Sequence, residues 1–440
     1  MPTHDHTVPR QLVVSADSEV TPAPGVINVQ GSKNCFNHLL VVGLLGDDNH
    51  HLTLDNVPRI SDRHTTLRIL AETGLDVDVS GDRVDIGGAA RLAALRPRDV
   101  RRLRVSICYG AAVAAARGMC FIPLPGGDAF TPRPIDLHVG ILAAAGADVS
   151  VCDAGVWVDF DRAPRAFDRD VSGPYGPSMG ASVTALAVAA VATGTSTIRG
   201  ISHEPEVDQV KQTLRLAGVT VADVDAQTCI VEGAGGPLSG ELARTVPADR
   251  QEAATYICIA AARRKPLQLR GLEVDDLPQG LREAMDAVGI GLQQSPDGSV
   301  PAVRMTTDAQ LHGIEVDTAP HPGYPTDAQP QLAALLAFAH GNSVVHETIY
   351  RERTSHVGEL RKVNIGIEIE GPRQRVTGGQ TARSGTTTVR DIRCGAAVLV
   401  AAAASNGHVV LDDPSGHLCR GYGDLTTKLN ALDLRAQWAA

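Results

Sequence analysis

The sequence predicts an α/β chain assembled from copies of one helix–strand unit. Three observations point to this fold class: the chain is long enough for two cores, one short pattern recurs along it, and the copies are evenly spaced. In each copy an amphipathic helix ends at a residue that tolerates left-handed backbone geometry, and two short alternating strands follow. The helices end at Gly74, Gly146, Gly218, Gly289, Asn364 and Asp433, roughly 70 residues apart.

The copies follow one another in chain order. They span 67–79, 141–151, 213–224, 284–292, 360–371 and 429–437. Glycine ends four of the six helices, and Asn364 and Asp433 adopt the same geometry less easily. Ordinary helix-to-strand turns would be irregularly spaced, so the regular interval favours a true repeat. Six units divide into three and three, with a connector at 245–250 between Gly218 and Gly289.

Composition limits the class of protein. The 440 residues are 43% hydrophobic and 20% charged, and the length favours two domains of roughly 200 residues each. A net charge of −10 argues against a nucleic-acid partner, which needs a broad basic face. The eight cysteines lack the spacing of a zinc site, so we expect reduced thiols and no metal. Without a signal-peptide pattern or a long apolar run, we expect a cytoplasmic protein with no membrane partner.

The stretch LPGGDAFTPRPIDLH, from Leu124 to His138, has the composition of a functional loop. It places the carboxylate of Asp128 five residues before Arg133. Two glycines precede the acid and two prolines flank the arginine, so a flexible segment is followed by a stiff one. Such a loop suits a lid that carries a proton to an anionic substrate. A surface turn with an incidental charge is the alternative.

Further motifs extend this pattern along the chain. They are GSKN at 31–34, TAPHPGYPTDAQPQ at 318–331, and DIRC at 391–394 followed by CRGY at 419–422. In this order, and together with the loop, they resemble the UDP-N-acetylglucosamine enolpyruvyl transferases. These enzymes start peptidoglycan synthesis by moving an enolpyruvyl group from phosphoenolpyruvate to a sugar hydroxyl. The resemblance runs from about Val26 to about Leu432, nearly the whole chain.

The resemblance implies a two-domain, inside-out α/β barrel with its active site in the interdomain cleft. The first domain would span 31–246 and hold the uridine nucleotide and the loop with Asp128. The second would combine 1–30 with 247–440, because in the family the N-terminal strand belongs to it and the chain crosses over at Gly31. Closure of such a cleft would expel water and strengthen each charge contact inside.

The resemblance also assigns roles to cations. Lys33 corresponds to a family lysine that binds the phosphate of phosphoenolpyruvate, and Arg133 and Arg420 correspond to arginines that line the same pocket. Arg353 and Arg393 correspond to arginines that hold the substrate carboxylate, where the planar guanidinium group fits two oxygens.

Arg104 corresponds to a further active-site arginine. Its neighbours Arg101 and Arg102 leave the register of this correspondence open. For any single arginine of the set, a solvated surface charge is the alternative, and the joint match in order argues against it.

Two aspartates complete the expected catalytic set of Asp128, Asp327, Lys33 and Arg420. Asp327 corresponds to the family aspartate beside the acceptor hydroxyl and is expected to remove its proton; a turn-capping aspartate is the alternative. Asp128 stands where most members carry a cysteine that acts as general acid, and a minority carry aspartate. Burial or a nearby charge must raise the pKa of Asp128 for it to carry a proton at neutral pH. We expect resistance to fosfomycin, which alkylates that cysteine.

The acceptor site is expected around three segments. The family segment that reads the uracil ring corresponds to Arg133, Pro134, Ile135, Asp136 and Leu137. Asn34 corresponds to an asparagine near the acceptor sugar. Ser178 and Gly180 belong to a loop whose backbone amides hold the nucleotide phosphates. Gly176 stands where many relatives have a lysine, which weakens the hold on a diphosphate.

Other departures leave the acceptor open. Cys419 replaces an acidic residue of the family, and Asp433 replaces a glycine. Such changes suit a paralogue with a different acceptor. We therefore consider transfer to UDP-N-acetylglucosamine, transfer to the ribose of UMP in nucleoside antibiotic synthesis, and an inert regulatory paralogue that binds nucleotide. Retention of both acids and the basic set argues against the last. The expected partners are phosphoenolpyruvate and a uridine nucleotide, without a cofactor, in a monomer or weak homo-oligomer.

Overall fold

The computed structural model describes residues 10–16, 20–92, 94–127, 134–296, 301–307 and 310–439. The chain divides into two compact units. The central unit is Gly31–Pro247, and the terminal unit combines Met1–Gln30 with Ala248–Ala440. The limits expected from the sequence differ from these in the placement of one residue, Pro247. Each unit has its own hydrophobic core.

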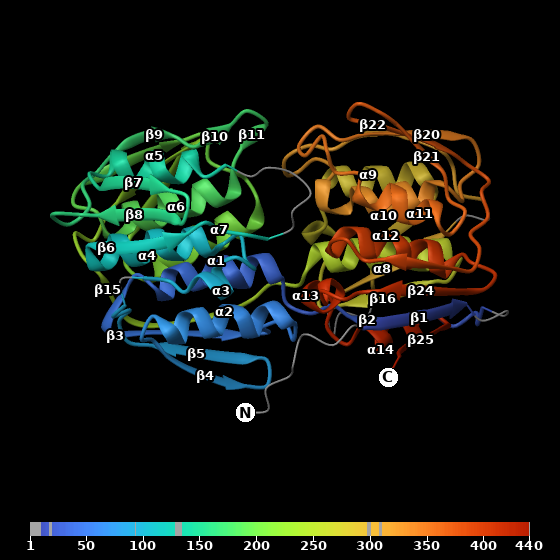
Figure 1. Cartoon of the computed structure of the whole chain (residues 1–440), viewed down its shortest axis with the longest axis horizontal. Coiled ribbons are helices and arrows are strands. Elements are labelled where there is room, and N and C mark those ends of the chain that lie inside the picture. Colours follow the sequence, from blue (N-terminus) through green and yellow to red (C-terminus); the bar gives the residue numbers. More distant parts are fainter. Residues whose placement is uncertain are drawn as a thin grey trace. The chain divides into compact units, whose positions relative to one another are not determined.

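Within the described residues, the central unit encloses three buried helices in three sheets (Figure 1). The buried helices are α1 (Lys33–Gly43), α4 (Ser106–Arg117) and α6 (Met179–Val191), which pack on one another. Nearly every side chain of α4 and α6 is buried, and most are small, which lets the helices approach closely. The remaining helices are α2 (Ser61–Glu72), α3 (Pro97–Val100), α5 (Asp136–Ala144) and α7 (Pro205–Leu216).

The described part of the central unit has three larger sheets, two of four strands and one of three. The first has the order β15–β3–β5–β4: Leu238–Thr245, Gly46–Asp55, Arg83–Gly87 and Asp76–Ser80. The second is β6–β8–β7: Met119–Pro123, Gly155–Asp159 and Asp148–Cys152. The third is β13–β14–β12–β9: Thr220–Asp225, Thr228–Glu232, Thr195–Arg199 and Asp168–Asp170. A small hairpin joins β10 (Ser172–Gly173) to β11 (Gly176–Pro177).

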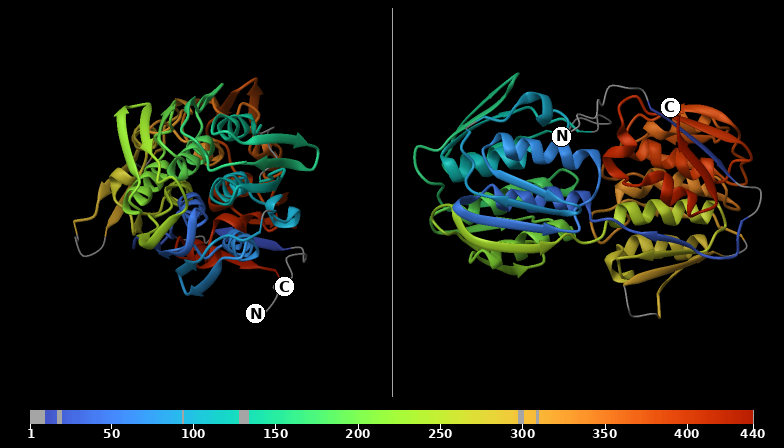
Figure 2. Two further views of the ribbon diagram at one scale, coloured as in Figure 1. Left: turned by 90° about the vertical axis from the view of Figure 1, so that its left-hand side faces the viewer. Right: turned by 90° about the horizontal axis from the view of Figure 1, so that it is seen from below.

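The described part of the terminal unit repeats this arrangement. Its buried helices are α8 (Arg250–Ala262), α10 (Gln329–Leu336) and α12 (Ile392–Ala403), which also pack on one another. Around them lie α9 (Gln279–Val288), α11 (Ser355–Arg361), α13 (His417–Gly421), α14 (Leu425–Asn430) and the short 3₁₀ helices η1 (Val274–Asp276) and η2 (Thr326–Ala328). Figure 2 shows the strands on the outer side of each unit.

Within the described residues, each sheet of the terminal unit holds four strands. The first is β17–β18–β16–β2: Ile290–Gln294, Ala302–Thr307, Leu267–Arg270 and Gly25–Asn28. The second is β19–β20–β22–β21: Glu315–Asp317, Asn342–His346, Arg373–Thr377 and Ile367–Glu370. The third is β23–β24–β1–β25: Gly385–Thr388, His408–Asp412, Gln11–Ala16 and Leu434–Trp438.

The predicted α/β fold of six helix–strand repeats is confirmed. The six expected helix-ending residues all have positive φ: Gly74 (100°), Gly146 (99°), Gly218 (85°), Gly289 (93°), Asn364 (69°) and Asp433 (56°). Five of the helices lead into an antiparallel strand pair. In the sixth copy β25 pairs with β1 from the start of the chain, with Val14 opposite Ala436. Within the described residues, β1 therefore supplies the strand that pairs with β25 in the sixth repeat.

β2, the strand that precedes the central unit, belongs to the terminal unit, as the resemblance implied. β2 runs parallel to β16, with Val26 opposite Gln268. The carbonyl of Gln30 accepts a hydrogen bond from the backbone N–H of Asp249 at 2.8 Å, just before the chain enters the central unit at Gly31. Among the residues that the structure describes, every helix is too short or too polar to span a lipid bilayer.

Candidate active site

The terminal unit holds Asp327 between two arginines. Its Oδ1 lies 2.8 Å from Nη1 of Arg353, and its Oδ2 lies 2.8 Å from Nη2 of Arg393. The arginine side chains are 4% and 15% exposed, whereas Asp327 retains 27% exposure. Two guanidinium groups therefore hold both oxygens of one carboxylate near the surface of the unit. This arrangement brings together three of the residues that the sequence analysis singled out.

The local sequence fixes each member of this cluster. Asp327 is the second residue of η2, and this short helix directly follows Pro325. Arg393 lies in the first turn of α12, where Asp391 caps the helix by accepting hydrogen bonds from the backbone N–H groups of Arg393 and Cys394. Nη1 of Arg353 also donates to the Thr326 carbonyl at 2.5 Å. A rigid turn and a capped helix thus set the positions of the charges before any substrate binds.

The two arginines decide the charge of Asp327. Burial by itself raises the pKa of this carboxyl group, but Arg393 and Arg353 outweigh burial and hold the pKa well below its ordinary value. Burial lowers the pKa of Arg393, and the charge of Asp327 reverses that effect and raises it. Asp327 is therefore ionised at neutral pH, and while both arginines hold it, it is a weak base.

Three further polar residues are linked to this cluster by hydrogen bonds, and no motif in the sequence predicted a role for them. The hydroxyl of Tyr422 accepts a hydrogen bond from Nη1 of Arg393 at 3.4 Å. Thr255 lies 3.0 Å from that hydroxyl, and Gln331 donates to Thr255. Tyr422 and Thr255 are 167 residues apart in sequence. No local motif signals a contact over such a separation, although Tyr422 closes the CRGY motif.

Arg420 lies in the short helix α13 of the same unit. Asp413 caps this helix by accepting hydrogen bonds from the backbone N–H groups of His417 and Leu418 at 2.7 and 2.9 Å. Nη1 of Arg420 lies 3.4 Å from Nδ1 of His417. Cys419, which replaces the acidic residue of the family, has its sulfur 3.5 Å from Nη1 of Arg10. The role of Arg420 in phosphate binding remains a prediction.

In the central unit, Lys33 begins α1. Ser32 caps the helix, accepting a hydrogen bond from the backbone N–H of Cys35 at 3.2 Å. Nζ of Lys33 lies 2.6 Å from Oδ2 of Asp62, which is 4% exposed, whereas Lys33 is 18% exposed. Asn34 is half-buried on the same turn. The ion pair holds the ammonium group at the N-terminus of α1, and the role of Lys33 in phosphate binding remains a prediction.

Arg104 contacts the segment expected to read uracil. Its Nη2 donates to the carbonyl of Pro134 at 2.6 Å. Ile135 precedes α5 and gives it no side-chain cap. Asp136 is exposed in the first turn and Leu137 is half-buried. The contact supports the assignment of Arg104, rather than Arg101 or Arg102, to this region.

The base of the Asp128 loop is built from two required glycines. Gly127 has φ of 106°, which side chains rarely adopt. A Cβ at Gly126 would lie 1.6 Å from the carbonyl oxygen of Arg101, so the backbone approach excludes any side chain there. Asp128 and Arg133 themselves lie outside the described residues, and their roles remain predictions.

The expected phosphate loop ends at the start of α6. Ser178 caps this helix, its hydroxyl accepting a hydrogen bond from the backbone N–H of Ala181 at 3.3 Å. A Cβ at Gly180 would lie 3.3 Å from Cε1 of His138, so the residue is closely packed. Gly176 has φ of 106° in the β10–β11 hairpin. A lysine side chain at this position would be strained in the backbone conformation of this chain.

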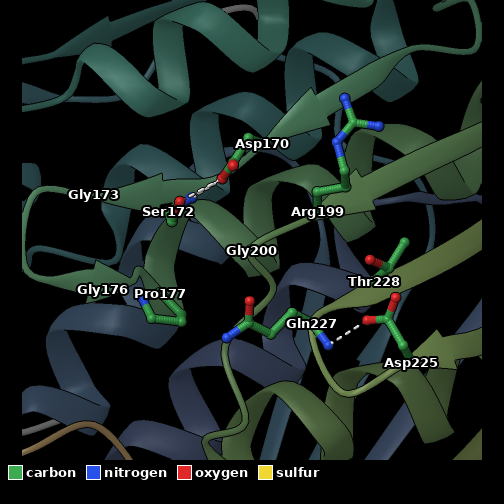
Figure 3. Close-up of a pocket in the computed structure, with 10 residues that line it drawn as sticks. All are labelled: Asp170, Ser172, Gly173, Gly176, Pro177, Arg199, Gly200, Asp225, Gln227 and Thr228. Carbon is green, nitrogen blue, oxygen red and sulfur yellow. Dashed lines mark hydrogen bonds between the residues drawn. The ribbon is translucent and has the colours of Figure 1, made fainter.

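A pocket of about 410 Å³ lies beside this hairpin (Figure 3). It is lined by Asp170, Ser172, Gly173, Gly176, Pro177, Arg199, Gly200, Asp225, Gln227 and Thr228. Asp170 accepts hydrogen bonds from the backbone and side chain of Ser172, and Asp225 accepts one from the backbone of Gln227. Arg199, the cation among these lining residues, lies 2.5 Å from Asp168. Two carboxylates and a neutralised guanidinium make this pocket unfavourable for phosphate.

Comparison with known proteins bears on these sites. A family model described as EPSP synthase (3-phosphoshikimate 1-carboxyvinyltransferase) matches residues 18–429. The chain belongs to this family. It is accordingly a transferase of the carboxyvinyl, or enolpyruvyl, type.

The chain is also similar to curated proteins from several bacteria. The chain is 34% identical over 418 residues to a UDP-N-acetylglucosamine 1-carboxyvinyltransferase of Zymomonas mobilis, covering 93% of this chain and 95% of that protein. It is 29% identical to UDP-N-acetylglucosamine 1-carboxyvinyltransferase 1 of Staphylococcus epidermidis, covering 96% and 97%. The predicted resemblance is confirmed.

Solved structures of this carboxyvinyltransferase family share the fold. The enolpyruvyl transferase NikO from Streptomyces tendae matches with a TM-score of 0.85 at 22% identity, covering 98% of this chain and 100% of that one. EPSP synthase from Acinetobacter baumannii matches with a TM-score of 0.73 at 17% identity, covering 98% and 100%. At these identities the structures support the fold, and the acceptor has to be argued from the site.

Proposed function

We propose that the chain transfers the enolpyruvyl group of phosphoenolpyruvate to a hydroxyl of a uridine nucleotide and releases phosphate. The favoured acceptor is the 3-hydroxyl of UDP-N-acetylglucosamine, as in peptidoglycan precursor synthesis. The observation that carries the proposal is the pair of arginines, Arg353 and Arg393, each 2.8 Å from an oxygen of one carboxylate. Groups that hold the Asp327 carboxylate in this way have the charge and planar shape to hold the carboxylate of phosphoenolpyruvate.

The chemistry assigns a task to each proposed group. The acceptor oxygen bonds to C2 of phosphoenolpyruvate, and its proton passes to Asp327, whose ionised state fits that role. Asp128 supplies a proton to C3, giving a tetrahedral phosphate ketal. Asp128, now a carboxylate, takes a proton back from C3, and cleavage of the bond between C2 and the phosphate oxygen yields the enolpyruvyl ether and phosphate. Lys33 and Arg420 stabilise the departing phosphate by charge.

When substrate binds, the two arginines can exchange their ion pair with Asp327 for one with the substrate carboxylate. When the substrate carboxylate binds Arg353 or Arg393, Asp327 loses part of its cationic neighbourhood. Its pKa then rises towards the ordinary value, and it becomes a stronger base. Substrate binding would thus activate the group that removes the acceptor proton.

UMP is the second candidate acceptor, and the phosphate loop favours it. Gly176 stands where many relatives have a lysine, and the adjoining pocket carries Asp170 and Asp225. UMP needs contacts for one phosphate group, whereas a sugar nucleotide with a diphosphate needs contacts for two, so missing cations in this loop weaken the binding of the diphosphate more. The amides around Ser178 still provide anion-binding groups at the start of α6. The two candidates therefore differ in the number of phosphate groups that this loop has to hold.

Phosphate release separates the candidates. The protein is incubated with phosphoenolpyruvate and either UDP-N-acetylglucosamine or UMP, and free phosphate is measured over time. We expect release that requires both phosphoenolpyruvate and the sugar nucleotide. Turnover with UMP alone would reject the favoured acceptor and keep the reaction class. A folded protein that is silent with both nucleotides would count against the proposed function.

A further inference from the structure

A closed ring of hydrogen bonds passes through Asp327 in the terminal unit. We call it the polar ring, formed by Asp327, Arg393, Tyr422, Thr255 and Gln331. From the Asp327 carboxylate it runs to Arg393 at 2.8 Å and from Arg393 to the Tyr422 hydroxyl at 3.4 Å. It continues to Thr255 Oγ1 at 3.0 Å and to Nε2 of Gln331 at 3.0 Å. Gln331 returns to the backbone carbonyl of Asp327 at 3.2 Å.

The donors and acceptors around the ring have one consistent assignment. Thr255 donates its only hydroxyl proton to the carbonyl of Gln251 at 3.1 Å. It therefore accepts from Gln331 and from the hydroxyl of Tyr422. Tyr422 then accepts from Arg393, so each hydroxyl in the chain both donates and accepts. Such a chain fixes the orientation of every member, because reversing one bond would leave another without a donor.

The ring joins the three buried helices of the unit. Thr255 belongs to α8, Gln331 to α10 and Arg393 to α12. Thr255 and Gln331 are fully buried, and Tyr422 is 3% exposed. Water competes little for these bonds, so they hold their geometry more firmly than surface contacts. The charged end of the ring, in contrast, faces outward at Asp327.

We propose that Tyr422, Thr255 and Gln331 are positioning residues for enolpyruvyl transfer, holding the Arg393 guanidinium and the Asp327 backbone in place when the substrate carboxylate displaces their mutual ion pair. The inference rests on the proposed function of Arg393 and Asp327. Arg393 contacts Asp327 through Nη2 and Tyr422 through Nη1. Loss of the first contact on substrate binding leaves the second, so the guanidinium plane keeps its orientation.

Two variants with matched chemistry test the tyrosine. Tyr422→Phe removes the hydroxyl of the ring. Tyr256→Phe removes the hydroxyl of a fully buried tyrosine on α8, whose ring packs edge-on against Tyr422 and whose hydroxyl makes no hydrogen bond within the described residues. We expect Tyr422→Phe to raise KM for phosphoenolpyruvate about 10-fold, the low end for a hydrogen bond to a charged group. We expect Tyr256→Phe to leave KM and kcat unchanged.

A double-mutant cycle separates positioning from general stability. If Tyr422 acts through Arg393, Tyr422→Phe added to Arg393→Lys should raise KM for phosphoenolpyruvate no further. The Gln331 side chain donates to the backbone carbonyl of Asp327, so Gln331→Met should lower kcat more than it raises KM. A KM for Tyr422→Phe within twofold of the wild type, equal losses in Tyr422→Phe and Tyr256→Phe, or additive effects in the cycle would overturn the inference.

The test remains decisive if the proposed function fails. A wild-type protein that releases no phosphate with any uridine nucleotide would reject the function. The ring is then judged by calorimetric binding of phosphoenolpyruvate alone. About 10-fold weaker binding by Tyr422→Phe, with unchanged binding by Tyr256→Phe, would support the ring, and equal binding by both would reject it.

Discussion

At the residue scale, Asp327 is an acid whose neighbours keep it ionised. Its folded-state pKa is lower than that of the unfolded chain, so its stabilising contribution is complete above the unfolded pKa. The contribution is lost only as the pH falls through the folded pKa. Titration of Asp327 in the free protein therefore cannot produce a change in activity or stability between pH 5 and pH 8.

Asp327→Asn tests the role of this charge. The amide is similar in size but cannot accept a proton, so we expect kcat for phosphate release to fall by about 10²- to 10⁴-fold, the usual contribution of a general base. Thermal unfolding checks that the variant is folded. A folded variant with kcat within threefold of the wild type would show that Asp327 is not the base.

Asp128 is tested by its reactivity. A carboxylate lacks the nucleophilic sulfur that fosfomycin alkylates, so we expect the wild-type protein to keep its activity after incubation with the drug. Asp128→Cys should restore time-dependent inactivation and a covalent adduct visible by mass spectrometry. Rapid stoichiometric inactivation of the wild type would contradict the assignment of this loop position.

Glu252 is a buried acid near the start of α8. Burial raises its pKa to about 7, although Lys428 lies 2.7 Å from Oε1 and opposes the shift. The folded chain therefore binds a proton at Glu252 that the unfolded chain has released. Because of this linkage, the free energy of unfolding falls as the pH rises from the pKa of Glu252 in the unfolded chain towards 7. Above pH 7 it changes little further.

Glu252→Gln should remove this pH dependence. Comparing pH 5 with pH 8 by urea unfolding, we expect the wild type to lose on the order of 2 kcal/mol more stability than the variant. The difference between the two proteins isolates Glu252 from histidines that titrate in both. Parallel curves for the wild type and the variant would contradict the raised pKa.

At the element scale, the base of the Asp128 loop depends on close backbone packing. Gly126→Ala would place a Cβ 1.6 Å from the Arg101 carbonyl oxygen. We expect a loss of about 1–3 kcal/mol in urea unfolding, as for other overpacked sites, and a lower kcat. Gly236→Ala is the control, because its added Cβ meets no atom within 4 Å. Equal stability of the two variants would show that the loop base rearranges freely.

The sequence predicted elements better than contacts between elements. The helix ends at Gly74 and Asn364 were predictable because left-handed geometry restricts the choice of residue. The motifs also indicated Asp327 and Arg393, but as separate roles for base and carboxylate binder. Their ion pair could not be predicted, because it joins residues 66 apart through the packing of η2 and α12. Tyr422 and its buried partners were missed for the same reason.

At the scale of the whole molecule, the first and last strands complete one repeat. β1 lies between β24 and β25, so the sixth copy has its second strand at the opposite end of the chain. The regular spacing predicted six copies, but not which segment closes the last. That pairing depends on the three-dimensional proximity of the two ends of the chain rather than on a local pattern.

Leu12→Ala tests this closure. Leu12 is fully buried in β1, and a buried Leu→Ala change costs about 2–5 kcal/mol. Val13, on the opposite face of the strand, is half-buried, and we expect Val13→Ala to cost about 1 kcal/mol. Urea unfolding measures both. Equal and small effects would show that β1 adds little to the terminal unit.

Oxygen-18 labelling tests directly whether the protein transfers the enolpyruvyl group by cleaving the bond between carbon and oxygen in phosphoenolpyruvate. Phosphoenolpyruvate is labelled with oxygen-18 in the bridge between C2 and phosphorus and incubated with the protein and UDP-N-acetylglucosamine or UMP. Enolpyruvyl transfer breaks the bond between C2 and this oxygen, so the account predicts that released phosphate keeps the label and that the nucleotide gains an unlabelled enolpyruvyl group. Label retained on the three-carbon product, with unlabelled phosphate, would show cleavage at phosphorus and contradict it.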